Sequence, residues 1–334
     1  MTRRARATIL WLIAVATLAA CTSCSGPVVT AVGDSNDLVI IHDAGAGDIA
    51  GLAVATMEGE QSWLLGEPLF STTVTTADRA GDLKSLRHVL LVGSREGGGV
   101  ADMARKVFPG LERAGAPELM IAEDVWAKRQ VVAALIGDDL PSVESFLRER
   151  GEEVRAAIEE AAVERLADSL VEAAAEAGMK SAMEERFGWS VSPPTGYDLF
   201  TTNFADGFVF FRRTGPDRTV FLYWTQGGPE YVSEQYAIAA RDEVAGAYFD
   251  GDAIEWNRPV EAEYVEFAGR KAVRVSAWWG NRELVGGGPF RTYCFYDEGS
   301  GRVYLLDVSL FAPSYDKTAL MRNLDAIAHT FEVK

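Results

Sequence analysis

The sequence has few of the residues that build metal sites and disulfide frameworks. Its 334 residues include only three cysteines and three histidines. Three cysteines cannot cross-link a chain of this length, and three scattered histidines supply a metal site poorly. The Gly-x-Ser-x-Gly and His-Glu-x-x-His motifs of hydrolases are also absent from the sequence. We therefore predict no cofactor, no metal site and no recognisable set of catalytic residues.

Positive charge is scarce after the N-terminus. The chain carries 32 basic and 49 acidic residues, which gives a net charge of −17 at pH 7. No basic patch is visible after the first six residues, and nucleic acids are bound by clustered Lys and Arg. We therefore expect no nucleic-acid partner. With 48% hydrophobic and 24% charged residues, the composition is that of a globular protein with ample material for a core.

The apolar run at the N-terminus is too short to span a bilayer. Three arginines in the first six residues precede this run, which extends from Ala7 to Ala20, whereas a membrane span needs ~20 apolar residues. This order is typical of a signal peptide. The run ends in Leu18-Ala19-Ala20-Cys21, which resembles the bacterial lipobox. The resemblance implies cleavage before Cys21 and attachment of acyl chains such as palmitate to it, so residues 1–20 are predicted to be a lipoprotein signal peptide.

Residues 21–36 are small, polar and interrupted by Gly and Pro, which is typical of a flexible tether. With acylated Cys21 inserted in the lipid bilayer, we expect the protein in the cell envelope. Thr22 stands where an aspartate would indicate retention in the inner membrane, so the outer membrane is favoured. Cys24 and Cys294 could form a disulfide in an oxidising compartment. For Cys294 we favour a buried thiol, because it lies in an apolar, strand-like run.

Hydrophobic periodicity divides the body of the chain into two halves. In the first half, residues 37–187, Pro141 opens a long helical region that ends near Phe187 and carries acidic residues opposite its apolar face. In the second half, residues 188–334, short turns favour antiparallel pairing. We predict an α+β fold of two layered domains with mainly antiparallel sheets, joined by this long acidic amphipathic helix. The expected strands are 37–43, 69–76, 88–93, 118–126, 130–136, 207–213, 218–225, 261–268, 271–280, 290–297 and 302–311, and the shorter helices are 49–57, 100–108, 232–247 and 319–331.

An aromatic and glycine-rich segment is the candidate recognition surface. Adjacent residues of a strand point to opposite faces, so one of Trp278 and Trp279 should face outward beside the glycine-rich loop that follows. Such a patch could bind a partner or an apolar ligand, and the alternative is that a helix or loop covers it. The candidate residues are Trp278, Trp279, Gly287, Gly288, Pro289 and Phe290.

A second glycine-rich stretch, Gly93–Gly99, lies between a predicted strand and a predicted helix. A phosphate could bind at such a helix N-terminus. The stretch lacks Gly-Lys-Ser/Thr and does not have the spacing of the dinucleotide-binding motif. We interpret it as an ordinary loop. We likewise interpret the acidic residues at 250–255 as a polar turn, because they lack the pattern of a calcium-binding loop.

Several short stretches in order, behind the lipobox, resemble a family of bacterial envelope lipoproteins known as a domain of unknown function. The resemblance implies lipoprotein character and supplies no catalytic residues. In the family pattern a proline follows Trp-Ala-Lys, whereas Arg129 stands there in this chain. The second half also resembles, loosely, the layout of the PsbP-like α/β/α sandwich. The stretches that carry the family resemblance are Glu67-Pro68-Leu69-Phe70, Asp124-Val125-Trp126-Ala127-Lys128 with Gln130, Ala240-Arg241-Asp242, Gly287-Gly288-Pro289-Phe290, Phe311-Ala312-Pro313 with Asp316-Lys317, and Leu324-Asp325-Ala326-Ile327.

These features together predict a membrane-anchored envelope lipoprotein that acts as a non-enzymatic binding or assembly module for an envelope protein partner. One alternative is an envelope hydrolase with an unrecognised carboxylate site, which a cleft with a carboxyl group of strongly raised pKa would favour. Another is a carrier of a small ligand, which needs a closed apolar pocket. A flat, exposed aromatic patch would favour the binding module.

Overall fold

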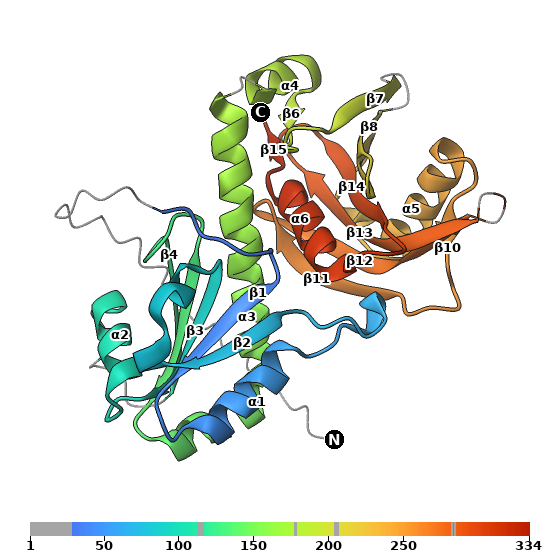
Figure 1. Ribbon diagram of the computed structural model, residues 1–334. Helices are drawn as coiled ribbons and strands as arrows, with labels where there is room; N and C mark the ends of the chain where they lie inside the picture. The colour runs from blue at the N-terminus through green and yellow to red at the C-terminus, as the bar shows by residue number, and fades with distance from the viewer. Residues whose placement is uncertain (1–28, 112–116, 177–178, 204–206, 282, 284) are drawn as a thin grey trace, which may run out of the picture.

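The computed structural model describes residues 29–334 except 112–116, 177–178, 204–206, 282 and 284 (Figure 1). The predicted signal peptide, Cys21 and Cys24 lie outside the described residues. Within the part of the chain that the structure describes, no helix is both long and apolar enough to cross a membrane.

The N-terminal half is built on a five-stranded sheet in the order β2-β1-β3-β5-β4. The first four in this order pair in parallel, and β4 adds an antiparallel edge. Helices α1 and α3 cover one face of this sheet and α2 covers the other (Figure 1). Its bounds are β1 (Asp37–His42), α1 (Gly47–Met57), β2 (Ser71–Thr76), β3 (His88–Ser94), α2 (Gly99–Val107), β4 (Glu118–Glu123) and β5 (Val131–Gly137).

The parallel pairing of this sheet departs from the mainly antiparallel pairing predicted for both halves. Each parallel step has a connection long enough to carry the chain back to the starting edge, through α1, through two short 3-10 helices, or through α2 and β4. Strands β3 and β5 are buried along their whole length, as expected for strands covered on both faces.

The long helix α3 (Leu140–Glu176) spans both halves of the molecule (Figure 1). Arg150, with φ of −131°, interrupts it next to Gly151. Gly151 packs against α1, where an added Cβ would lie 3.0 Å from Thr56 Cγ2. The first part of α3 covers the N-terminal sheet, and its later part packs Val163 and Ala167 against Ala326. Helix α4 (Met179–Phe187) follows and ends where the sequence predicted.

The C-terminal half is an eight-stranded antiparallel sheet in the order β10-β12-β13-β14-β9-β8-β7, with β11 paired to β12. Helix α6 packs on one face and α5 on the other, so the predicted α+β class of layered sheets is confirmed. A two-stranded sheet pairs β6 (Trp189–Ser190) with β15 (Glu332–Val333). The bounds are β7 (Asp198–Asn203), β8 (Phe208–Arg213), β9 (Asp217–Gln226), α5 (Glu234–Tyr248), β10 (Ala253–Ile254), β11 (Glu261–Phe267), β12 (Arg270–Asn281), β13 (Gly286–Asp297), β14 (Arg302–Phe311) and α6 (Lys317–His329).

Arg322 of α6 joins the two halves. Its side chain is 1% exposed, and its Nε donates to Glu159 Oε2 on α3 at 2.9 Å. It also donates to the carbonyl oxygens of Ser35 and Leu69, the latter at 2.8 Å, and its guanidinium lies 4.4 Å from the centre of the Phe70 ring. One guanidinium therefore holds α6, α3 and two segments of the N-terminal half together.

The residues before β1 are not a free tether. Ala31, Ser35 and Asn36 are buried, and Asn36 Nδ2 donates to Asp316 Oδ2 at the start of α6. The prediction of a flexible tether over 21–36 is therefore wrong for residues 29–36. These residues pack because an extended backbone can hydrogen-bond with neighbouring segments on both sides, whatever its composition.

Candidate functional site

A groove lies between α5 and the ends of β9 and β14, on the face of the sheet opposite α6, with a volume of ≈ 730 Å³. We call it the tyrosine groove. It is open to solvent and lies within the range of typical ligand pockets. Its lining residues are Gly207, Tyr223, Trp224, Thr225, Gln226, Tyr236, Ala239, Ala240, Glu243, Val244, Ala247, Tyr248 and Arg302.

Helical spacing places one wall of the groove. Tyr236, Ala240, Glu243 and Ala247 follow one another at steps of three or four residues along α5, and these steps put them on one face. The helix starts at a fixed place because Ser233 Oγ accepts a hydrogen bond from the backbone N–H of Tyr236. The small alanine side chains on this face leave the space that the groove occupies.

The other wall comes from the sheet. Tyr223 of β9 lies on the α5 side of the sheet, among the residues of that core. Tyr248 closes the far end of the groove and stacks on Phe208, with ring centres 3.8 Å apart. Gly207 passes so close to the next strand that an added Cβ would lie 2.3 Å from the carbonyl oxygen of Trp224. Only glycine fits here, and it brings β8 against the groove.

The groove has polar groups of each kind. Burial, together with Cys294 and Tyr223 nearby, raises the pKa of Tyr236 to about 12, so its hydroxyl stays protonated at neutral pH. Tyr231, on the 3-10 helix η6 (Pro229–Tyr231), packs edge-on against Tyr236 at 5.0 Å. Arg302 lies 5.7 Å from the Trp224 ring and Glu243 is exposed on α5. The groove can therefore stack on flat ligand faces and hydrogen-bond to ligand edges.

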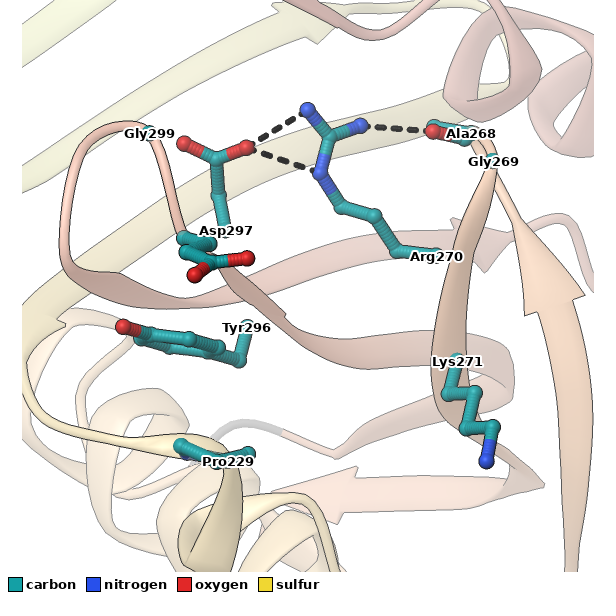
Figure 2. Close-up of a pocket in the computed structure, with 9 residues that line it drawn as sticks. Pro229, Ala268, Gly269, Arg270, Lys271, Tyr296, Asp297 and Gly299 are labelled. Atoms are coloured by element: carbon teal, nitrogen blue, oxygen red, sulfur yellow. Dashed lines mark hydrogen bonds and ion pairs between the residues drawn. The ribbon is translucent and has the colours of Figure 1, made fainter.

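A second, shallower hollow of ≈ 690 Å³ lies where the β11–β12 turn meets the β13–β14 turn (Figure 2). Arg270 Nε donates to Asp297 Oδ1 at 2.9 Å and its Nη1 donates to the carbonyl of Ala268, as Figure 2 shows. Burial alone would raise the pKa of Asp297, but hydrogen bonds from Ser300 and Arg270 outweigh it and hold that pKa below its usual range. The charges of this hollow thus fasten two turns together.

The predicted recognition surface is not exposed. Trp278 is buried, with its Nε1 donating to the carbonyl of Trp63 and the Arg258 guanidinium 4.2 Å from its ring centre. Trp279 is half-buried and donates to the carbonyl of Leu310 at 3.3 Å. A loop from the N-terminal half, carrying the 3-10 helix η1 (Ser62–Leu64), covers this part of the sheet.

The glycine-rich part of that prediction lies inside β13. Gly288, Pro289 and Phe290 are buried, and Gly287 is half-buried. A Cβ on Gly288 would lie 1.8 Å from the carbonyl oxygen of Leu310, so the glycine allows two strands to approach closely. The prediction of an exposed patch here is therefore wrong, and the alternative of a covered segment is what the structure shows.

Buried charges elsewhere in the C-terminal half are paired with one another. Asp307 accepts hydrogen bonds from Thr292 Oγ1 at 2.5 Å and Arg241 Nε at 3.3 Å, and burial raises its pKa. Burial alone would also raise the pKa of Asp325, but Arg291 and a hydrogen bond from Tyr293 lower it. These carboxyl groups lie outside both hollows.

The glycine-rich loop Gly93–Gly99 holds a carboxylate of the chain itself. Asp43 Oδ1 accepts a hydrogen bond at 3.0 Å from the backbone N–H of Val100, in the first turn of α2. A Cβ on Gly97 would lie 2.4 Å from Asp43 Oδ2. The place at which a phosphate would bind is thus taken, which agrees with the interpretation of an ordinary loop. Cys294 is a buried free thiol, and burial raises its pKa to about 12.

Comparison with known proteins gives distant similarities only. No curated protein matches the chain. A protein of Bacteroides thetaiotaomicron is 11% identical, with a TM-score of 0.28 over 44% of this chain and 45% of its own length, so less than half of that protein is spanned. LpqN, involved in cell envelope biogenesis of Mycobacterium tuberculosis, is 12% identical, with a TM-score of 0.29 over 44% of this chain and 83% of its own. The Saccharomyces cerevisiae Ran-binding protein Mog1p is 9% identical, with a TM-score of 0.31 over 44% and 90%.

The sequence of the C-terminal half gives a clearer result. The part of the chain that matches a family model includes α4, the eight-stranded sheet, the tyrosine groove and α6. Residues 176–330 match DUF4837, so this part of the chain carries a domain of unknown function.

Proposed function

We propose that the protein is a lipid-anchored cell-envelope protein that binds a partner through the tyrosine groove and performs no catalysis. The groove carries the proposal, because it gathers three tyrosine rings and the Glu243 carboxylate on one open surface, at the edge of which Arg302 lies. Aromatic and Arg side chains dominate the energetics of protein recognition sites. The lipobox at Cys21 supports the location in the envelope, and Thr22 favours the outer membrane.

The envelope hydrolase is the weaker candidate. General acid catalysis by a carboxyl group needs a raised pKa and access to the substrate. Asp307 has a raised pKa but is fully buried against Arg241. Asp252, whose pKa is raised by burial, accepts a hydrogen bond from Asn281 and does not line either hollow. A small-ligand carrier would need an enclosed cavity, whereas both hollows are open to solvent.

The anchor is tested by one substitution. Cys21→Ser removes the sulfur that would carry the acyl chains, so we expect the variant to move from the membrane fraction to the soluble fraction of cells. Fractionation with immunodetection checks this, and a Thr22→Ser variant is the matched control that should stay with the membrane. If Cys21→Ser carried no acyl chain and still stayed in the membrane fraction, the proposed lipid anchor would be wrong.

The groove is tested by filling it from the exposed side of α5. Ala239 and Ala247 are exposed and line the groove, so Ala239→Arg and Ala247→Arg add bulk there without entering the core. We expect in-cell crosslinking with mass spectrometry to recover one partner with the unaltered protein, and at least about tenfold less of it with either variant, which corresponds to a loss of ~1.4 kcal/mol.

Ala173→Arg, at an exposed position of α3, is the control for adding an arginine to a helix surface, and it should leave recovery of the partner unchanged. Equal recovery with the groove variants and the control would rule out the groove as the binding site. Recovery of the unaltered protein alone would contradict a partner-binding role altogether.

A further inference from the structure

Four basic side chains gather at one edge of the N-terminal sheet, although the sequence shows no basic run there. Lys84 and Arg87 come shortly before β3, and Lys128 and Arg129 lie in the β4–β5 turn. We call this cluster the basic rim. The segment that precedes β1 holds the two sites together: Ala31 N–H donates to the carbonyl of Lys128 at 2.9 Å, and Arg87 N–H donates to that of Val32 at 3.0 Å.

The charges of the basic rim are available to a partner. Lys128 and Arg129 are exposed, and Lys84 and Arg87 are half-buried. Within the described residues, none of the four side chains forms an ion pair with a carboxylate at 4.0 Å or less. Burial and the nearby Arg129 lower the pKa of Arg87, whereas Asp34 and Asp37 act in the opposite direction. Among the other carboxylates nearby, Asp124 is already paired with Arg165 at 2.9 Å.

The basic rim is bonded to a segment that lies close, along the chain, to the predicted lipid attachment site. Val29, the first described residue, hydrogen-bonds through its carbonyl with the Lys128 N–H at 2.9 Å. Seven residues lie between it and Cys21, so the two are eight steps apart along the chain. Even fully extended, eight residues reach at most ~28 Å. An acyl chain on Cys21 would therefore keep Val29, and the basic rim bonded to it, within about 28 Å of the bilayer.

We propose that the basic rim rests on the anionic headgroups of the membrane that holds Cys21, and so fixes the orientation of the body on the bilayer. This inference rests on the proposed anchor. The rest of this acidic chain is repelled by an anionic surface, so attraction at the rim and repulsion elsewhere favour a single orientation. Val29 and Val32, exposed at 58% and 54%, add apolar contacts at the same edge.

The test supplies the anchor chemically, so that it is independent of acylation in cells. A chain that starts at Cys21, with Cys24→Ser, keeps every described residue and is coupled through Cys21 to a maleimide lipid, because Cys294 is buried. The vesicles contain phosphatidylcholine alone or phosphatidylcholine with anionic phosphatidylglycerol. An amine-acetylating reagent and mass spectrometry then measure the reaction rate of each lysine.

We expect Lys128 to react at least about fivefold more slowly on the anionic vesicles. Each basic residue near such a surface contributes about a fivefold factor to the affinity for it. High salt should restore the rate, because it screens the attraction. Lys271, exposed in the C-terminal half, is the internal control and should react equally on both. In the double variant Lys128→Glu with Arg129→Glu, the protection of Lys84 should vanish, whereas Lys271→Glu should leave it intact.

Equal rates for Lys128 on the two kinds of vesicle, or protection that high salt does not reverse, would overturn the inference. That result would leave the anchor at Cys21 standing, because cell fractionation tests it separately. Conversely, failure of the anchor in cells would not alter this measurement, which reports only whether the rim recognises anionic lipid.

Discussion

Replacing Arg322 by alanine is expected to lower the free energy of unfolding by about 3–5 kcal/mol, the usual cost of breaking a buried ion pair from one side. The substitution leaves the carbonyls of Ser35 and Leu69 without their donor and removes the partner of Glu159. It also removes the guanidinium from the Phe70 ring. All four contacts join α6 to other parts of the chain, so their loss should weaken the coupling between the two halves.

Urea unfolding followed by tryptophan fluorescence measures this effect. Arg148→Ala is the matched control, because Arg148 pairs with Glu144 at an exposed position of α3 and should cost less than about 1 kcal/mol. Arg322→Lys keeps the charge but not the fork of donors, and should fall between the two. If the free energy of unfolding of Arg322→Ala lay within about 1 kcal/mol of that of the unaltered protein, this side chain would not be what holds the two halves together.

Acid should destabilise the protein well above the pH at which its carboxylates titrate, because of His88. This imidazole is buried at the start of β3, and its Nδ1–H donates to the carbonyl of Asp37 at 2.9 Å. Burial, with the charges of Arg322 and Arg87 nearby, lowers the pKa of His88 to about 3. The unfolded chain, in which the pKa is about 6.5, therefore binds a proton that the folded chain does not.

The stability that comes from neutral His88 is complete above about pH 6.5 and falls as the pH drops, by up to about 1.4 kcal/mol per pH unit, until about pH 3. His88→Asn keeps a donor for the Asp37 carbonyl but has no group that titrates. We therefore expect the difference in unfolding free energy between the unaltered protein and His88→Asn to shrink by about 2 kcal/mol from pH 6.5 to pH 5.

Urea unfolding at several pH values checks this, and the difference between the two proteins removes the contribution of His329, whose pKa burial also lowers. A difference that stays constant over this range would contradict a neutral buried His88. The same series in an Arg322→Gln background offers a further check, because loss of that charge should raise the pKa of His88 and end the loss of stability at a higher pH.

Local sequence patterns predicted most of the individual helices and strands. The alternation in 271–280 and 302–311, and the apolar stripe of 319–331, depend only on residues that are neighbours along the chain. The parallel order of the N-terminal sheet could not be read in this way, because it depends on which distant strands pair. The run at 37–43 predicts a buried strand equally well beside parallel or antiparallel neighbours.

The candidate sites likewise depend on contacts between distant parts of the chain, which local sequence patterns do not show. Alternation correctly separated Trp278 from Trp279, but the loop that covers Trp278 comes from Trp63, 215 residues earlier. Helical periodicity predicted α5, but it could not show that the sheet covers only part of this helix and leaves Ala247 exposed in the tyrosine groove. The basic rim was missed because its residues come from separate segments that only the fold brings together.

The contacts of Arg322 also limit the order in which parts of the molecule can fold. Arg322 and the carbonyl of Ser35 that it holds are 287 residues apart. A chain that is synthesised from its N-terminus can pair β1 with β2 and β3 early, but it cannot close this contact until α6 has been made. Until then the carbonyls of Ser35 and Leu69 lack their final donor, and Asn36 lacks its partner Asp316. A chain that lacks α6 therefore lacks the Arg322 contacts and is more easily cleaved by proteases. Docking of α6 is the last step of folding.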